Sequence, residues 1–194
     1  MIHFVTPYGR NGPSSRVRVF EWVDRLPGHH RVISYISQSN AKPAQLLRHP
    51  RSLMSAERML RRIAQTRPDR LVLHREASPL SRGELERRLL ATAGATVYDF
   101  DDALHCDWGA GGLLRRVAPK APKALVAVRH ADRVVAGNPT LADWASQHSK
   151  DVVVICDSKE IFRAPYSQVV APVAFTNFTP DGKRIIFCTN YFAT

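Results

Sequence analysis

Residues 96–102 read Thr-Val-Tyr-Asp-Phe-Asp-Asp, an apolar run that passes directly into carboxylates. The β-branched and aromatic residues in it favour a strand over Thr96–Phe100. Other short β-branched-rich runs predict further strands at Ile2–Thr6, Val32–Ile36, Arg70–Leu73, Asp132–Ala136 and Val152–Ile155. Segments with the apolar spacing of helices separate these runs. Such alternation predicts an α/β fold with a doubly wound, mainly parallel sheet.

The end of the chain has a different character. Residues 164–194 are rich in Pro, Phe, Thr and Val, and they include a predicted turn at Thr179–Gly182. Lys183–Phe192 is strongly strand-like, and it fits either a hairpin partner or the first strand of a further domain. We therefore expect an α/β domain over residues 1–155, followed by a linker and an irregular or β-rich tail over residues 156–194.

Composition restricts the class of protein. The chain has 194 residues, of which 44% are hydrophobic and 23% are charged, as in a globular protein. It has no apolar run of about 18 residues that would span a membrane, and its start lacks the pattern of a signal peptide. Its widely spaced cysteines, Cys106, Cys156 and Cys188, fit neither a disulfide framework nor a zinc site. We interpret them as reduced thiols in a cytoplasmic chain.

The formal net charge is +11. Acids and bases balance in residues 151–194, so the excess lies in residues 1–150, mostly as arginine and densest between Arg48 and Arg88. These arginines fit solvated helix faces, or alternatively a surface for phosphate or for an anionic membrane. A nucleic-acid partner is disfavoured, because basic and aromatic residues are not interleaved and no known module is present.

In an open parallel sheet, ligands bind beyond the carboxyl ends of the strands. The first strand ends in Tyr8 and Gly9, followed by Gly12, Ser15 and Arg16. Glycines allow close approach of a ligand, and the following helix start offers free N–H groups to an anion. The spacing is not that of a dinucleotide site, and a plain turn is the alternative.

Two further strand ends carry polar side chains. The third strand ends in His74, Arg75 and Glu76, a group that suits a polar ligand or a proton transfer, or that is merely solvated. The fourth carries the acids Asp99, Asp101 and Asp102. These carboxylates repel one another unless they are partnered, and the expected partners are Arg16, Arg18 and Arg75. The alternatives are an Asp–Arg network that supports the loops and a carboxylate metal site, for which further ligands are lacking.

Five segments stand in order at these strand ends: Val5–Tyr8, Pro13–Arg18, Leu73–Glu76, Tyr98–Leu104 and Val134–Ala142. Together they resemble the N-terminal half of a GT-B glycosyltransferase, close to the family 4 group of retaining enzymes. The resemblance covers about residues 2–155. It implies two Rossmann-like domains with the active site between them, the N-terminal domain holding the sugar acceptor and the C-terminal domain the nucleotide sugar.

The resemblance also implies roles for residues. The loop from Gly9 to Arg16 would touch the acceptor and the donor diphosphate. Asp101 and Asp102 stand where relatives often carry a His-Asp pair, a departure from the family pattern. The catalytic candidates are His74, Asp101 and Asp102. The candidate substrate-binding residues are Tyr8, Gly9, Gly12, Ser15, Arg16, Arg18, Arg75, Glu76, Asp99 and Asn138. The fold implies no cofactor and no metal, with a nucleotide sugar as substrate.

A full GT-B enzyme is roughly twice as long as this chain. We therefore expect a missing donor-binding domain, or pairing of two copies through the tail, and no sugar transfer by the 194-residue chain alone. Peripheral attachment to the anionic inner surface of the membrane is a further expectation. The alternative function is a non-catalytic α/β module that binds anions or a partner.

Overall fold

A computed structural model describes residues 1–36, 50–106 and 118–155, together with the backbone of residues 176–178 and 185–187. The chain divides into two units, Met1–Cys156 and Asp157–Thr194. In the second unit, strand β7 (Thr176–Phe178) pairs antiparallel with β8 (Ile185–Phe187). The predicted turn at Thr179–Gly182 and the residues Cys156 and Cys188 lie outside the described residues.

The first unit contains a six-stranded sheet in which every pair is parallel, in the order β2-β1-β3-β4-β5-β6. Its strands are β1 (Ile2–Tyr8), β2 (His30–Ile36), β3 (Arg70–His74), β4 (Ala95–Phe100), β5 (Arg133–Ala136) and β6 (Val152–Val154). The predicted α/β class with a parallel sheet is confirmed. β1 runs past its predicted end through Pro7, whose missing N–H leaves the pairing of Tyr8 with Ile36 intact.

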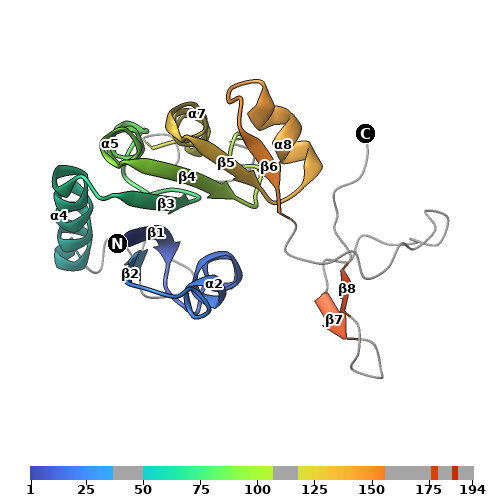
Figure 1. The fold of residues 1–194 in the computed structure, drawn as a ribbon, viewed down its shortest axis with the longest axis horizontal. Coiled ribbons are helices and arrows are strands. Elements are labelled where there is room, and N and C mark those ends of the chain that lie inside the picture. The colour runs from blue at the N-terminus through green and yellow to red at the C-terminus, as the bar shows by residue number, and fades with distance from the viewer. Residues whose placement is uncertain (37–49, 107–117, 156–175, 179–184, 188–194) are drawn as a thin grey trace. The chain divides into compact units, whose positions relative to one another are not determined.

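The helices cover the two faces of this sheet unequally. One face bears α4 (Pro50–Thr66), α5 (Glu84–Thr92), α7 (Lys120–His130) and α8 (Pro139–Ser146), as Figure 1 shows. The other face bears a continuous helical run, called here the first helical segment, made of α1 (Pro13–Ser15), η1 (Arg16–Phe20) and α2 (Glu21–Val23). Its middle part, η1, is a π-helix.

Two helix boundaries differ from the predicted ones. The sequence predicts a helix over Ser81–Leu90, but α5 begins at Glu84, because Gly83 adopts a left-handed φ of 116° that no helix contains. The sequence also predicts a basic helix that runs towards His130 with an interruption at Pro119 and Pro122. Pro119 instead occupies the N-cap of α7 and Pro122 its first turn, where a missing N–H costs nothing.

The apolar residues form two clusters, one on each face. The larger contains Leu73, Tyr98 and Phe100 of the central strands and the inward residues of the four helices. The smaller consists of Phe4, Val19 and Val23 under the first helical segment. Side chains alternate along a strand, so His74 and Asp99 belong to the face of the smaller cluster. The fold thus places two buried polar side chains on the sparsely covered face.

Candidate functional site

The candidate site lies where the chain direction across the sheet reverses. From β1 the chain passes to β2 on one side, and it returns to β3 on the other side before continuing to β6. The carboxyl ends of β1 and β3 therefore flank a topological switch point, the usual ligand-binding position of an open α/β sheet. The predicted site residues of β3 and β4, together with the first helical segment, meet at this edge.

Four side chains are hydrogen-bonded in series at the switch point. The Nδ1 atom of His74 lies 2.8 Å from a carboxylate oxygen of Asp99, and its Nε2 atom lies 2.9 Å from the Ser14 hydroxyl oxygen. The Ser14 hydroxyl in turn donates to Asp101. His74 is completely buried, whereas Ser14 and Asp101 are only partly so. The series Asp101–Ser14–His74–Asp99, called here the polar chain, thus connects the interior to the surface.

The hydrogen bonds of the polar chain fix how many protons it needs. Its three hydrogen bonds need three protons, and each carboxylate offers acceptors only. Ser14 supplies one proton and a neutral His74 supplies one. When Ser14 donates to Asp101, the hydrogen bond between Ser14 and His74 needs a proton on Nε2, which makes His74 an imidazolium. When Ser14 instead donates to His74, the hydrogen bond between Asp101 and Ser14 needs a proton on Asp101. With a neutral His74 and two charged carboxylates, the polar chain is therefore one proton short of three donated hydrogen bonds.

Arg18 closes the buried end of the polar chain. Its Nε donates to Asp99 at 3.1 Å, a terminal nitrogen pairs with the other oxygen of that carboxylate, and another donates to the Ile155 carbonyl at 2.7 Å. Burial by itself would raise the pKa of Asp99, but the hydrogen bonds from His74 and Arg18 outweigh it and lower that pKa. Asp99 is thus held as an anion between two donors. Arg18 lies in the π-helical turn, a feature often found at functional sites.

Arg75 forms the outer rim beside Asp101. Its backbone is left-handed at φ 63°, a conformation that costs a non-glycine residue free energy. Two contacts hold it: its N–H donates to the Asp99 carbonyl at 2.8 Å, and the Tyr98 hydroxyl donates to its carbonyl at 3.0 Å. The guanidinium lies 2.5 Å from an oxygen of Asp102 and 3.7 Å from Oδ1 of Asp101.

One polar atom at this rim remains unsatisfied. Oδ1 of Asp101 is buried and has no hydrogen-bond partner in the described part of the chain. Asp102 next to it is 55% exposed, so the rim opens to solvent on that side. A buried acceptor without a donor is uncommon and suits a hydroxyl or amide of a ligand.

Gly137, in the loop after β5, allows Asp101 its position. A Cβ atom at residue 137 would lie 2.9 Å from the Asp101 Cα, closer than real Cβ atoms approach. The Gly137 N–H donates to the Phe100 carbonyl at 2.9 Å, which fixes the two loops together. Only glycine fits at this contact.

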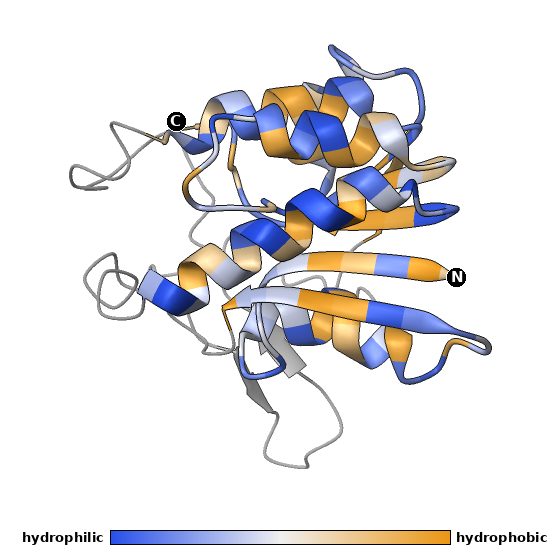
Figure 2. Ribbon diagram, turned by 90° about the vertical axis from the view of Figure 1, so that its left-hand side faces the viewer, coloured by the Kyte–Doolittle hydropathy of each residue, from blue (hydrophilic) through white to orange (hydrophobic). Residues whose placement is uncertain are grey.

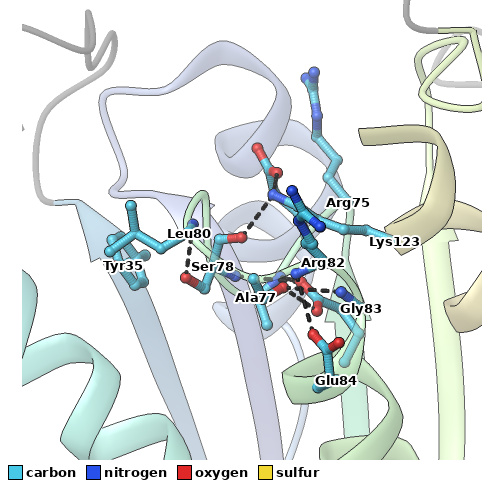
Figure 3. Close-up of polar contacts among 12 residues, drawn as sticks. Tyr35, Arg75, Ala77, Ser78, Leu80, Arg82, Gly83, Glu84 and Lys123 are labelled. Atoms are coloured by element: carbon cyan, nitrogen blue, oxygen red, sulfur yellow. Dashed lines mark hydrogen bonds and ion pairs between the residues drawn. The ribbon is translucent and has the colours of Figure 1, made fainter. Parts of the chain in front are cut away.

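The loop that follows Arg75 is held by a separate set of buried charges (Figure 3). The Lys123 ammonium lies 2.8 Å from a carboxylate oxygen of Glu76 and donates to the Ser78 carbonyl at 2.8 Å. Glu86 accepts from the Ala77 N–H at 3.1 Å, and burial raises its pKa. The Arg75 side chain extends away from these contacts (Figure 3). The loop contacts thus leave Arg75 directed to the rim, while Glu76 is engaged in an ion pair.

The structure brings some of the predicted residues together and separates others. Those that meet in the polar chain or directly beside it are His74, Asp99, Asp101, Asp102, Arg18 and Arg75. Ser15 instead bonds the Thr6 hydroxyl at 2.6 Å, and Asn138 caps α8 by accepting from the Leu141 N–H at 2.9 Å. Arg16 was expected to pair with the acids of β4, but it is exposed and lies 3.6 Å from Glu21.

The glycine loop after β1 is tightly packed. A Cβ atom at Gly12 would lie 2.6 Å from the Cβ of Tyr8, and the Gly12 N–H donates to the Gly9 carbonyl at 2.9 Å. Glycine at position 12 therefore serves the packing of the loop on Tyr8. The loop nonetheless carries Ser14 into the site, a residue of the predicted Gly9–Arg16 loop that was not among the candidate site residues.

Among the described residues, no group of three His, Cys, Asp or Glu side chains is placed to hold a metal ion, and no helix is both long and apolar enough to cross a membrane. No protein-family model matches the chain, and no curated protein matches it. The function must therefore be inferred from the site itself.

Proposed function

We propose that the chain forms the acceptor-side domain of a glycosyltransferase, with the acceptor hydroxyl held at the rim formed by Asp101, Asp102 and Arg75. The strand-end motifs that resemble GT-B enzymes support this proposal, and so does the position of their polar residues at the switch point. The observation that carries it is the polar chain, which has a use for one proton that its own groups do not supply.

In the proposed reaction, the acceptor hydroxyl supplies the proton that the polar chain lacks. An acceptor hydroxyl donates a hydrogen bond to Asp101 and becomes more nucleophilic. Its oxygen then forms the new bond to the sugar carbon, and the bond from that carbon to the leaving diphosphate breaks. The hydroxyl proton enters the polar chain, and Ser14 passes the equivalent proton to His74. The resulting imidazolium is stabilised by the Asp99 carboxylate, and the Arg75 guanidinium beside Asp101 supplies positive charge to the leaving diphosphate.

Acceptor binding by the purified chain tests the proposal. Saturation-transfer NMR against a panel of mono- and oligosaccharides and polyprenyl phosphates should find a ligand. Asp101→Asn should weaken its binding about tenfold or more, as expected for a buried charge-assisted hydrogen bond. Asp143→Asn, at an exposed position of α8, is the matched control and should bind normally. Either the absence of any ligand in the panel or equal binding by both variants would contradict the proposal.

A second candidate is the non-catalytic binding module. The observation in its favour is the Arg18–Asp99 pair, whose side chains are only 3% and 9% exposed and thus closed to a ligand. In that case the polar chain acts only as a structural brace. The two candidates differ in where the ligand binds. The ¹⁵N resonances of the His74 ring should change when an acceptor hydroxyl donates to Asp101, and they should stay unchanged in a module whose ligand binds elsewhere.

A further inference from the structure

A cavity lies at the end of the sheet opposite the switch point, where β1 and β2 begin. It measures about 630 Å³ and lies against the C-terminal half of α4. The arginines that line it are Arg31, Arg58, Arg62 and Arg67. Figure 2 views the molecule from the side of α4 and shows hydrophilic positions, in blue, interleaved with apolar ones along that helix. The cavity is thus distinct from the switch-point site and strongly basic.

The cavity has little negative charge of its own. Of the described residues that line it, Asp69 alone carries a carboxylate, and the Met1 ammonium lies 3.1 Å from it. Within the described residues, the guanidinium groups of Arg31, Arg62 and Arg67 have no hydrogen bond or ion pair, and that of Arg58 donates only to a helix carbonyl at 3.2 Å. These side chains line one cavity without a carboxylate partner, so each of them attracts an anion that enters it.

A buried histidine belongs to the same lining. His3 is only 6% exposed, and its Nδ1 atom is buried without a hydrogen-bond partner in the described part of the molecule. Burial, followed by the nearby Arg31 and Met1 charges, lowers the pKa of His3. A buried polar atom without a partner marks a place where a further group would complete the bonding.

The backbone at Arg67 is a third observation. Arg67 follows the last residue of α4 and has φ 47°, the left-handed conformation in which a helix usually ends on glycine. In the described residues, the non-glycine positions of positive φ are Arg67 and Arg75, one at each end of the sheet. Strain of this kind tends to accompany functional positions.

From these contacts we propose that the amino-end cavity binds a ligand that carries two or more phosphate groups. Arginine forks bind phosphate oxygens in pairs, and four of them around one cavity exceed what a single phosphate needs. Met59 and Ile63 add apolar surface beside the arginines, which fits an organic portion next to the phosphates. The phosphates belong either to a free polyphosphate compound or to a lipid headgroup, because both present the same chemistry.

Two binding experiments on the purified chain test this site. Inorganic pyrophosphate is titrated by calorimetry, and vesicles of cardiolipin, a lipid whose headgroup carries two phosphates, are compared with phosphatidylcholine vesicles by sedimentation. We expect pyrophosphate, the anionic vesicles or both to bind, with an affinity that falls as salt increases. Pyrophosphate alone identifies a free ligand, and vesicles alone identify a headgroup. Binding of neither would overturn the proposal.

Matched charge variants separate a built site from general attraction. Arg62→Gln combined with Arg67→Gln should weaken binding at least tenfold. Arg51→Gln combined with Arg61→Gln removes the same charge from exposed positions of α4 outside this lining, and it should change binding less than twofold. Equal losses in the two variants would show non-specific attraction and overturn the site. Asp101→Asn should leave this binding unchanged, so the test is independent of the function proposed for the switch point.

Discussion

His74 and Asp99 are direct partners in the parallel pairing of β3 and β4, and the His74 Nδ1 atom lies 2.8 Å from the Asp99 carboxylate. Because they share a register position, their side chains leave the sheet on the same face. The carboxylate holds the ring by Nδ1 and directs Nε2 to Ser14. The sheet itself therefore orients the histidine, and several measurable consequences follow from this arrangement.

Ser14→Ala should disconnect the two halves of the polar chain. It leaves the buried Nε2 of His74 without its partner and removes the donor to Asp101, so we expect a loss of about 1–3 kcal/mol in the free energy of unfolding. Urea unfolding measures it. Ser52→Ala, an exposed change on α4, is the control and should shift the midpoint little. Equal stability of the two variants would show that the contacts at Ser14 contribute nothing.

Asp99→Asn should be among the most destabilising changes, because Arg18 would keep a buried charge without its carboxylate. Breaking a buried ion pair costs about 3–5 kcal/mol. The cost should depend on pH. The folded-state pKa of Asp99 is lowered, so its contribution is present above the ordinary pKa of aspartate, and it is lost as the pH falls through the lowered value.

The difference in unfolding free energy between wild type and Asp99→Asn should therefore be large at pH 7 and shrink below about pH 4. Comparing the two proteins cancels groups of opposite sign such as Glu86, whose raised pKa favours the fold at low pH. A difference that stays constant from pH 7 to pH 3 would show that Asp99 does not act through its charge.

Arg75→Gly and Arg75→Ala remove the same guanidinium but differ in backbone freedom. At φ 63°, glycine relieves the left-handed strain, so the glycine variant should be about 1 kcal/mol more stable than the alanine variant. Both should lose ligand binding at the rim. Thermal unfolding compares their stabilities, and a more stable alanine variant would contradict the left-handed conformation.

Lys123→Met should leave the Glu76 carboxylate poorly solvated and unpaired, at a cost of about 3–5 kcal/mol. Adding Glu76→Gln to it should restore part of that loss, because no unpaired charge remains. Chemical denaturation of the single and double variants measures the recovery, with Lys150→Met as an exposed control. A double variant that is less stable than Lys123→Met would refute the pairing as its cause.

Gly137→Ala should displace Asp101, since the new methyl group would meet the Asp101 backbone at 2.9 Å. Overpacking of this kind costs about 1–3 kcal/mol, and the His74 ring resonances should shift as Ser14 loses Asp101. Gly28→Ala is the comparison: it has open space around it but a φ of 94°, so it should lose stability with the His74 signals unchanged. Unchanged His74 signals in Gly137→Ala would contradict this prediction.

The strands and the polar residues at their carboxyl ends could be predicted from the sequence, because hydrophobic periodicity and β-branched runs are local signals. It also indicated correctly that Arg18 and Arg75 would pair with the acids of β4. Arg16 was a wrong choice of partner. The first helical segment contains a π-helical turn, which changes which side chains face the sheet and could not be read from 3.6-residue spacing.

The contacts between distant residues could not be predicted in this way. Ser14 meets His74 across 60 positions, and Glu76 meets Lys123 across 47. Neither pair leaves a local pattern, since each depends on how loops from different strands cross. Capping alone explains a serine near a helix start, so the contact of Ser14 with His74 could not be recognised from the sequence.

The first helical segment has a consequence for the stability of the site. It carries both Ser14 and Arg18, so it supplies contacts at both ends of the His74–Asp99 pair. Among the described residues, the apolar cluster between it and the sheet has three buried members, Phe4, Val19 and Val23. Regions with few buried apolar contacts open at a lower free energy than the global fold. Opening of this one segment would release both contacts together, so amide exchange of residues 14–23 reports directly on how often the histidine meets water.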